Sequence, residues 1–405
     1  MPGNLPDGST AVVGASPGSL DGNSSLFSQR RAEAQRTGRM KSQLTIDARW
    51  LKGGIGTYTR HLLEGLGKHG NGFDVHAITR GEHRREVEQW CPRVSVVDAR
   101  IYTAREQWAV PWAARGCGLL HVPHYNAPLF ERAPMVITIH DVIHLTDPAY
   151  GRSFKAWAYA RLMLYKAARK AARIITVSEY SKDQIIERLD VPNAKVSTIP
   201  NGADKEFLPM DKGTAFRRVS TALGIRGPYL LFVGGLKPHK NVATLLRAFA
   251  LLRERREISQ RLVILGHGER VYDELVRECL RLQIGPWVDF VAPVHRALLP
   301  QVYAAADTLV MPSTAEGFGL PVLEAMACGT PVICSQAASL PEVGGDAALY
   351  FDPRSVEGLA DAMERLLDST ELREAMRNKG LAQASRFTWK ESVERHIQVY
   401  RAALG

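Results

Sequence analysis

The most specific chemical pattern in this chain of 405 residues is a pair of glutamates, Glu316 and Glu324, on either side of a glycine-rich stretch. A strand-like run precedes them, and Pro321 and Gly329 are the residue types expected at the start and end of a helix. Unpaired N–H groups at a helix start suit phosphates, and nearby carboxylates can accept hydrogen bonds from hydroxyls. The pattern predicts a site for a ligand that carries both groups. The alternative is a helix with ordinary loop glycines and a surface glutamate.

A second pattern is the basic stretch from Val233 to Asn241, which follows another strand-like run and leads into a helix. Lys237, His239 and Lys240 cluster in it, where they could neutralise a diphosphate without a metal ion. Solvated basic loops are also common, so a purely structural role stays open.

A third pattern is the glycine-rich segment that includes Gly53 and Gly54, between the first predicted strand and a helix from about residue 56 to 68. Glycines allow a backbone to approach a ligand closely. The spacing is not the GxGxxG of dinucleotide-binding proteins, so a simple tight turn is the alternative.

A fourth pattern is His140 and Asp141, which end a strand-like run at residues 135–140. Other histidines lie nearby in the sequence, but the spacings match no HExxH or zinc-ribbon motif, so we expect no metal site. A structural histidine at a strand end is the alternative to a catalytic one.

The stretch 152–173 contains seven Lys or Arg and no acid. Six of the seven basic residues fall on one face of a helix, which suits either an acidic membrane or solvent. We therefore expect peripheral contact with an acidic membrane as one role of this helix, with a solvated face as the alternative.

Strand-like and helical segments alternate along the chain in two series, as in a parallel sheet covered by helices. The predicted strands of the first series are 44–47, 73–79, 94–97, 119–122, 135–140 and 174–178. Those of the second are 229–233, 261–265, 288–291, 308–311, 331–334 and 348–351. The sequence therefore predicts an α/β protein with two doubly wound domains joined near residues 201–212.

Composition excludes several classes of protein. The chain is 45% hydrophobic and 23% charged, as in globular proteins, and no apolar run reaches the ~18 residues of a membrane span. Five cysteines without a CxxC pair predict neither a disulfide framework nor structural zinc. The net charge of +10 favours an anionic partner. We expect a cytoplasmic protein without a signal peptide, a disordered tail over residues 1–40, and translation that starts at Met40 as a further hypothesis.

Several motifs in order resemble those of one known family, the retaining glycosyltransferases of family 4, from about Ser42 to Leu404. The motifs are the segments 53–58, 139–141, 177–181 and 199–202, the Lys240-Asn241 loop and the E-x7-E pair. The resemblance implies the GT-B fold, in which two Rossmann-like domains face a central cleft. It implies an acceptor-binding domain over 41–205, a nucleotide-sugar-binding domain over 206–385 and a helix over 386–405 that crosses back to the first domain.

The resemblance also implies roles for individual residues. Glu316 and the loop amides would contact the donor sugar, Glu324 the ribose, Lys240 the diphosphate, and His140 the sugar's hydroxymethyl group. The resemblance makes His140, Lys240 and Glu316 catalytic candidates. The donor-binding candidates are Gly53, Gly54, Asn201, Gly235, His239, Gly317, Phe318, Gly319, Leu320 and Glu324. Many members carry an arginine where this chain has Gly235, so His239 or Lys237 would have to replace it.

The implied reaction is hexose transfer from a nucleotide sugar to a glycan or a lipid-linked acceptor, with retention of configuration and without metal or other cofactor. GDP-mannose is the expected donor, and UDP-glucose or UDP-N-acetylglucosamine is the alternative. We expect no nucleic-acid partner, because basic and aromatic residues do not interleave. Rival functions are an epimerase or phosphorylase on the same fold and a non-enzymatic, membrane-surface protein.

Overall fold

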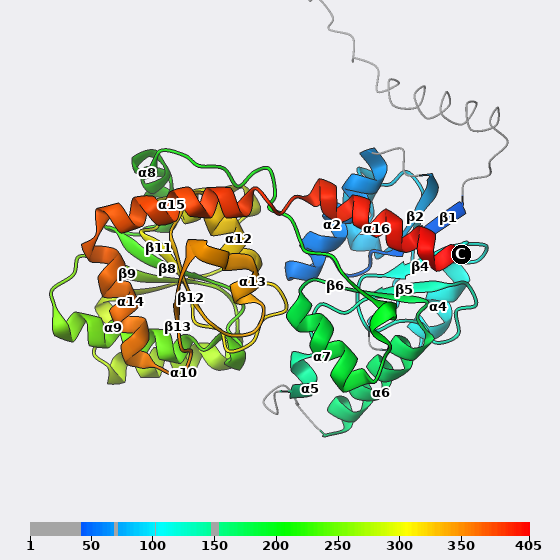
Figure 1. Ribbon diagram of the computed structural model, residues 1–405, viewed down its shortest axis with the longest axis horizontal. Coiled ribbons are helices and arrows are strands. Elements are labelled where there is room, and N and C mark those ends of the chain that lie inside the picture. Colours follow the sequence, from blue (N-terminus) through cyan, green and yellow to red (C-terminus); the bar gives the residue numbers. More distant parts are fainter. Residues whose placement is uncertain (1–41, 69–71, 102, 147–153) are drawn as a thin grey trace, which may run out of the picture. The chain divides into compact units, whose positions relative to one another are not determined.

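The computed structural model describes residues 42–68, 72–101, 103–146 and 154–405. The predicted tail, with Met40, lies outside the described residues. The chain divides into two units, Met1–Ser42 and Gln43–Gly405, and the second contains two separate parallel sheets (Figure 1).

The first sheet has seven strands in the order β3-β2-β1-β4-β5-β6-β7, and each recorded pair is parallel. Its strands are β1 (Ser42–Asp47), β2 (Phe73–Thr79), β3 (Val94–Val96), β4 (Leu119–Val122), β5 (Met135–Thr138), β6 (Arg173–Thr176) and β7 (Val196–Thr198). Strands β4 and β5 are buried along their whole length, which is why they are continuous apolar runs in the sequence.

Helices cover both faces of this sheet and form two apolar cores. The helices whose side chains enter the first core are α2 (Gly53–Lys68), α3 (Arg84–Glu88) and α16 (Trp389–Leu404). Those of the second core are α4 (Glu106–Ala113), α6 (Phe154–Lys170) and α7 (Glu179–Leu189), and the short α5 (Ile143–Thr146) packs on α6. The last helix of the chain, α16, thus lies along α2 and also contacts β4 and β5 (Figure 1).

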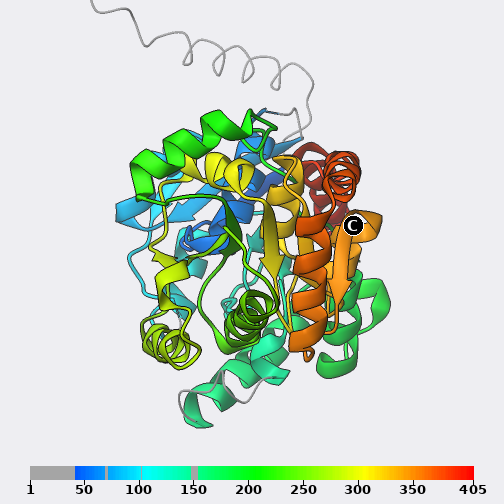
Figure 2. The ribbon, with the colours of Figure 1, turned by 90° about the vertical axis from the view of Figure 1, so that its left-hand side faces the viewer.

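The second sheet has six strands in the order β10-β9-β8-β11-β12-β13. Its strands are β8 (Tyr229–Val233), β9 (Arg261–Leu265), β10 (Val288–Val291), β11 (Thr308–Met311), β12 (Val332–Ser335) and β13 (Ala348–Phe351). On one face lie α8 (Lys212–Leu223), α11 (Leu299–Ala305), α12 (Leu320–Ala327), α13 (Leu340–Gly344) and α15 (Thr370–Ala384). On the other lie α9 (Val242–Arg255), α10 (Glu269–Arg281) and α14 (Val356–Asp368), and α9 packs on α14 (Figure 1 and Figure 2).

Both sheets follow the Rossmann strand order. Successive strands are added on one side of the first strand, and then the order switches to its other side. Ligands of such sheets bind beyond the carboxyl ends of the strands at this switch point, which lies between β1 and β4 in one sheet and between β8 and β11 in the other. The sequence prediction of two doubly wound α/β domains is confirmed.

Three details of the sequence prediction were wrong. The predicted strand 135–140 ends at Thr138, so His140 stands in a loop, and the short strand β7 was not predicted. The glycines at 53–56 form the first turn of α2 and not a loop before it. No helix among the described residues combines the length and the apolar character needed to cross a membrane.

Candidate functional site

Glu316 and Lys240 form an ion pair beyond the carboxyl ends of β8 and β11. The Lys240 ammonium donates to Glu316 Oε1 at 2.6 Å, and Ser313 Oγ donates to the same oxygen at 2.7 Å. Glu316 is 8% exposed, so this pair is largely removed from water. Because both donors bind Oε1 and no described residue donates to Oε2, the second oxygen is available to a ligand hydroxyl.

The segment from Gly317 to Leu320 carries the chain from Glu316 into α12. Ser339 Oγ donates to the carbonyls of Glu316 and Phe318, both at 3.0 Å, and so fixes the loop. Gly319 precedes the helix with φ +107°, and a Cβ there would lie 2.8 Å from Leu340. Within the described residues no acceptor is recorded for the amides of Gly317, Phe318 and Gly319, so these N–H groups can bind an anion or a sugar oxygen.

His140 contacts this loop through its backbone. A Cβ on Gly317 would lie 2.4 Å from the His140 carbonyl oxygen, so only glycine fits there. Ser178, the N-cap of α7, donates to the Gly317 carbonyl at 2.7 Å, and Ser181 lies 3.2 Å from the carbonyls of both Gly317 and His140. The structure therefore brings together four residues that lie up to 177 positions apart in the sequence: His140, Lys240, Glu316 and Gly317.

The imidazole of His140 is held in one orientation. Its Nε2 lies 3.2 Å from the Pro123 carbonyl, which can only accept, so Nε2 carries the proton and Nδ1 is the acceptor. The Tyr58 ring packs on it nearly at right angles, with ring centroids 4.9 Å apart. Burial lowers the pKa of His140, against the raising effects of Asp141 and the Pro123 carbonyl. His140 is therefore neutral at pH 7.

A buried hydrogen-bond chain supports Tyr58 from α16. Tyr400 donates to His121 Nδ1 at 2.7 Å, and His121 Nε2 donates to Thr138 at 2.9 Å. Thr138 then donates to Tyr58 at 2.8 Å, and Tyr58 donates to His396 Nε2 at 2.6 Å.

The hydrogen bond made by His396 at the end of this series fixes which group donates in each of the others. His396 Nδ1 donates to the Ser392 carbonyl at 2.6 Å, which leaves Nε2 to accept from Tyr58. Burial lowers the pKa of His396 to about 4 and that of His121 well below its usual value, so both stay neutral. Tyr58 belongs to the motif at residues 53–58. No prediction from the sequence covered the residues on α16 that support it, because no periodic pattern marks them.

Glu324, on α12, is half-buried and accepts a hydrogen bond from Tyr303 at 2.7 Å through Oε2. Burial raises the pKa of this carboxyl to about 7, although the Tyr303 hydroxyl lowers it. The nearby Asp204 also raises this pKa, while His61 and Arg60 lower it. No described residue donates to Oε1, so Glu324 can accept from a ligand hydroxyl when it is ionised.

This pKa predicts that donor affinity falls in mild acid. If Glu324 holds the ribose as expected, its carboxylate accepts from a hydroxyl when ionised above pH 7 and is protonated below pH 7. We therefore expect binding of a nucleotide sugar to be about tenfold weaker at pH 6 than at pH 8. A nucleotide sugar is the proper probe because its diphosphate diester does not titrate in this range. Calorimetry should show the same affinity at both pH values for Glu324→Gln, and a pH-independent wild type would contradict the prediction.

Gly53 and Gly54 are exposed at the first turn of α2. Gly53 has φ +61°, which an L side chain rarely adopts. Gly54 has ordinary φ, and a Cβ on it would lie 3.7 Å from Leu320 Cδ1, which is normal van der Waals contact. The glycine-rich turn therefore lies next to the segment that follows Glu316.

Gly54→Ala separates a binding role from a folding role. The added methyl group fits the protein, so we expect a change in thermal midpoint within about 2 °C, while donor affinity falls about tenfold because the methyl blocks close approach of phosphates. Gly285→Ala is the control, since a Cβ there meets nothing within 4 Å and the added methyl group should fit there as well. Equal donor affinity in the two variants would show that no phosphate approaches Gly54.

The remaining candidate residues make no recorded side-chain contact with the Lys240–Glu316 pair in the described part of the chain. Gly235 and Lys237 are exposed. Burial raises the pKa of Asp141, next to His140, and the positive charge of Lys237 partly opposes this rise. His239 is 6% exposed, and its carbonyl accepts from the Thr314 amide at 2.8 Å. Asn201 is buried, and no described residue binds its Oδ1. No recorded contact joins Asn201 to Lys240 or Glu316.

Other proteins are similar to this chain in sequence and in fold. Residues 52–207 match the family described as Glycosyltransferase Family 4, and residues 217–383 match Glycosyl transferases group 1. The chain is 33% identical to O-antigen chain mannosyltransferase B of Escherichia coli over 293 residues, which cover 72% of this chain and 76% of that protein. It is 31% identical to D-inositol 3-phosphate glycosyltransferase of Actinosynnema mirum over 369 residues, covering 86% and 83%.

Solved structures agree with the fold. Anabaena Alr3699/HepE, in complex with UDP and glucose, superposes with a TM-score of 0.74 at 20% identity over 89% of this chain and all of its own. The lipopolysaccharide glycosyltransferase WaaG superposes with a TM-score of 0.70 at 16% identity, covering 88% and 99%. Two Rossmann-like sheets with these neighbours define a GT-B fold. The chain belongs to the group 1 and family 4 glycosyltransferases, and the expectation of a transferase enzyme is confirmed.

Proposed function

We propose that this glycosyltransferase moves a hexose from a nucleotide sugar, most readily GDP-mannose, to a glycan or lipid-linked acceptor, with retention of configuration and without a metal ion. The observation that carries the proposal is the Lys240–Glu316 pair beside the free loop amides at the switch point of the second sheet. Lys240 and the amides would bind the diphosphate, and the free oxygens of Glu316 and Glu324 would bind hydroxyls of the hexose and the ribose.

The residues suit the charge changes of such a transfer. The bond from the anomeric carbon to the diphosphate oxygen breaks, and negative charge grows on the diphosphate, where Lys240 and the amides lower the barrier. The acceptor oxygen then bonds to the same face of that carbon, and its proton passes to the departing phosphate oxygen. His140 Nδ1 would accept from the hydroxymethyl group of the hexose.

A second cation is needed beside Lys240, since Gly235 supplies none. We assign this role to Lys237, which is exposed and electrostatically close to Asp141, whereas His239 is buried. We expect His239 to shape the loop through its carbonyl, which binds Thr314.

The donor is proposed from relatives whose names include mannosyltransferase, from Escherichia coli and Mycolicibacterium hassiacum. A UDP-hexose is the alternative, because a protein of the same fold binds UDP-glucose. A non-enzymatic role is excluded by membership of the family. An epimerase or phosphorylase would release a rearranged sugar or a sugar phosphate.

Product analysis tests the proposal. The enzyme is incubated with α-linked GDP-mannose, excess chelator and a panel of alkyl glycosides, and the product is examined by NMR. We expect an α-linked product at the same rate with and without chelator. A β-linked product, a strict need for metal, or a rearranged sugar alone would contradict it.

We also propose that the enzyme works in the cytoplasm at an acidic membrane, through exposed faces of α4 and α6. Trp108 and Trp112 are 64% and 66% exposed, and Phe130 stacks on Trp108 with centroids 4.3 Å apart. Lys170, at the end of α6, donates to carbonyls on either side of Phe130 and so joins the two faces. Further exposed residues of α6 are Arg161, Leu162, Tyr165, Lys166 and Arg169. Arg152 lies outside the described residues.

Exposed tryptophans beside cations suit the interface of an anionic bilayer. We expect Trp108→Ser/Trp112→Ser to weaken binding to vesicles of phosphatidylglycerol and phosphatidylcholine at least about tenfold in co-sedimentation. Trp287→Ser, at another exposed tryptophan, is the control. Equal binding of the double variant and the wild type would contradict membrane contact through this surface.

A further inference from the structure

A buried cluster of charged side chains lies where the chain passes between the two sheets. His61, on α2, has Nε2 3.0 Å from Asp204 Oδ2 and Nδ1 3.6 Å from Glu64 Oε2. Arg296, which begins the 3-10 helix η6 (Arg296–Leu298), donates to the same oxygen of Asp204. The Trp389 ring stacks on His61 with ring centroids 4.6 Å apart. We call these five residues the His61 cluster.

The cluster fastens α2 to both chain segments that connect the two sheets. One segment follows β7 and the other precedes α16. The two run in contact, since the Ala203 amide donates to the Phe387 carbonyl at 3.0 Å. A Cβ on Gly202 would lie 2.2 Å from the Trp389 nitrogen. His61 is only 7% exposed, so its contacts with these segments are shielded from water.

On one side the cluster leads to Glu324. The Phe207 amide donates to the Asp204 carbonyl at 3.0 Å, and the Phe207 ring packs on that of Tyr303 with centroids 5.8 Å apart. Tyr303 donates to Glu324. Arg296 adds a second connection, because η6 runs directly into α11, which carries Tyr303. Asp204 is therefore fixed to the part of the second domain that is proposed to bind the ribose.

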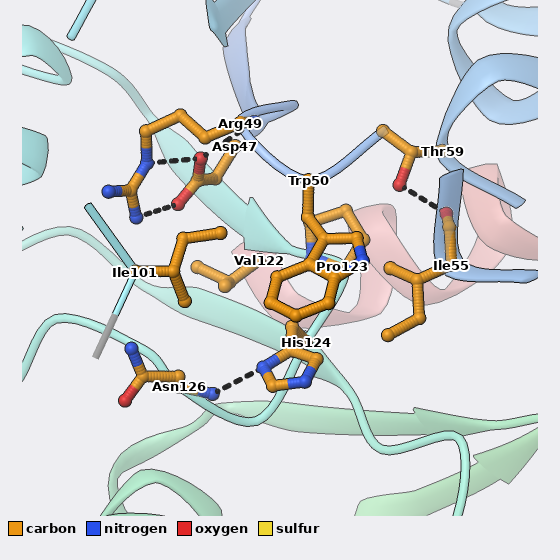
Figure 3. Close-up of a pocket in the computed structure, with 10 residues that line it drawn as sticks. All are labelled: Asp47, Arg49, Trp50, Ile55, Thr59, Ile101, Val122, Pro123, His124 and Asn126. Carbon is orange, nitrogen blue, oxygen red and sulfur yellow. Dashed lines mark hydrogen bonds and ion pairs between the residues drawn. The ribbon is translucent and has the colours of Figure 1, made fainter. Parts of the chain in front are cut away.

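On the other side the cluster leads to His140 through α2. Positions 59 and 61 are about 200° apart around the helix, so they face opposite ways. Thr59 donates to the Ile55 carbonyl at 2.8 Å, and both residues line the same recess as Pro123 (Figure 3). The Pro123 carbonyl is the group that orients the His140 imidazole. The helix that His61 holds thus packs beside the segment that positions His140.

Trp389 provides a second path to His140. Its ring packs on Tyr58 as well as on His61, with centroids 6.4 Å from that of Tyr58. Tyr58 in turn packs on His140. A displacement of His61 would therefore reach His140 both through α2 and through Trp389.

The hexose of the donor is proposed to lie between His140 of the first domain and Glu316 of the second. Groups on separate domains hold one ligand productively only when the domains are aligned, and an error of ~1 Å can slow a reaction about 100-fold. We propose that the His61 cluster sets this alignment, with His61 as a positioning residue that acts through α2 and Asp204. This inference rests on the proposed transferase function.

The test separates hexose transfer from nucleotide binding in variants of the full chain. The probes are the donor that the enzyme binds, GDP-mannose or UDP-glucose, and the matching nucleoside diphosphate. The main nucleotide-binding groups, Lys240 and Glu324, both belong to the second domain. We therefore expect His61→Ala to lower the single-turnover rate of transfer at least about tenfold, while the Kd of the diphosphate stays within about threefold of the wild type.

Arg296→Gln breaks the cluster from the second domain, which keeps the test valid if His61→Ala fails to fold. It should slow transfer in the same way, whereas Arg296→Lys keeps a cation beside Asp204 and should retain most of the rate. His83→Ala is the matched control. His83 also faces two glutamates, at 3.3 and 3.8 Å, but lies outside the cluster, so this variant should match the wild type.

Wild-type transfer rates in both His61→Ala and Arg296→Gln would overturn the inference. So would a loss of diphosphate affinity as large as the loss of rate, because the cluster would then act on nucleotide binding and not on alignment. A wild type that binds no nucleotide sugar and transfers no hexose would instead contradict the proposed function.

Discussion

Lys240→Ala is expected to lower kcat at least about 100-fold, because we propose that its ammonium binds the leaving diphosphate as that group develops negative charge. Its removal also leaves the Glu316 carboxylate buried without its cation, so a lower thermal midpoint should accompany the loss. Single-turnover kinetics with saturating donor measure the chemical step directly.

Ser313→Ala is the matched control for Lys240→Ala. It removes the other hydrogen bond to the same oxygen of Glu316 but no charge. We expect this variant to keep kcat within about tenfold of the wild type. Similar rates for Lys240→Ala and the wild type would mean that Lys240 serves only to neutralise Glu316.

Glu324→Ala is expected to weaken nucleotide-sugar binding about 100-fold, since a charged acceptor of ribose hydroxyls contributes more than a neutral one. Calorimetry with the intact donor measures this loss. An unchanged Kd would place the ribose elsewhere.

Tyr303→Phe is the matched control for Glu324→Ala. It removes the hydrogen bond from Tyr303 but keeps the carboxylate, so donor affinity at pH 8 should stay within about threefold of the wild type. Because the Tyr303 hydroxyl lowers the pKa of Glu324, its loss should move the acid-side decline in affinity to higher pH. These two responses separate the role of the carboxylate from that of its neighbour.

Much of the fold could be predicted from the sequence, because the central strands of these sheets are buried on both faces. Apolar runs such as those of β8 and β9 are bounded by turn residues, and their predicted bounds agree with the structure. Strand β7 was missed because Val196–Thr198 is short and alternates in burial, so it lacks a continuous apolar run.

The loop after β5 shows where pattern alone misleads. Ile139 is fully buried and extends the apolar run, but the recorded strand ends at Thr138. Beyond it the backbone turns to contact Gly317 and α7, a tertiary contact that sequence periodicity does not encode.

The residue types of the candidate site can be read from the sequence, but the contacts between them cannot. The Glu316 and Lys240 motifs are recognisable singly, whereas the ion pair between them spans 76 residues. The Asn241 side chain, quoted in the same motif, binds the Pro312 and Pro353 carbonyls at 3.1 and 2.9 Å and so anchors the loop. The chain of hydrogen bonds from Tyr400 to Ser392 joins distant segments whose pairing only the folded chain reveals.

The most direct test of metal-independent donor binding at this site is calorimetric titration with GDP-mannose and UDP-glucose in excess chelator. We predict that the wild type binds GDP-mannose without metal, more tightly than UDP-glucose, and that Glu324→Ala loses this binding. Tighter binding of UDP-glucose would mean that the donor is a UDP-hexose, while the proposed donor site would stand. Binding of neither donor, or equal binding by wild type and Glu324→Ala, would contradict the proposed site.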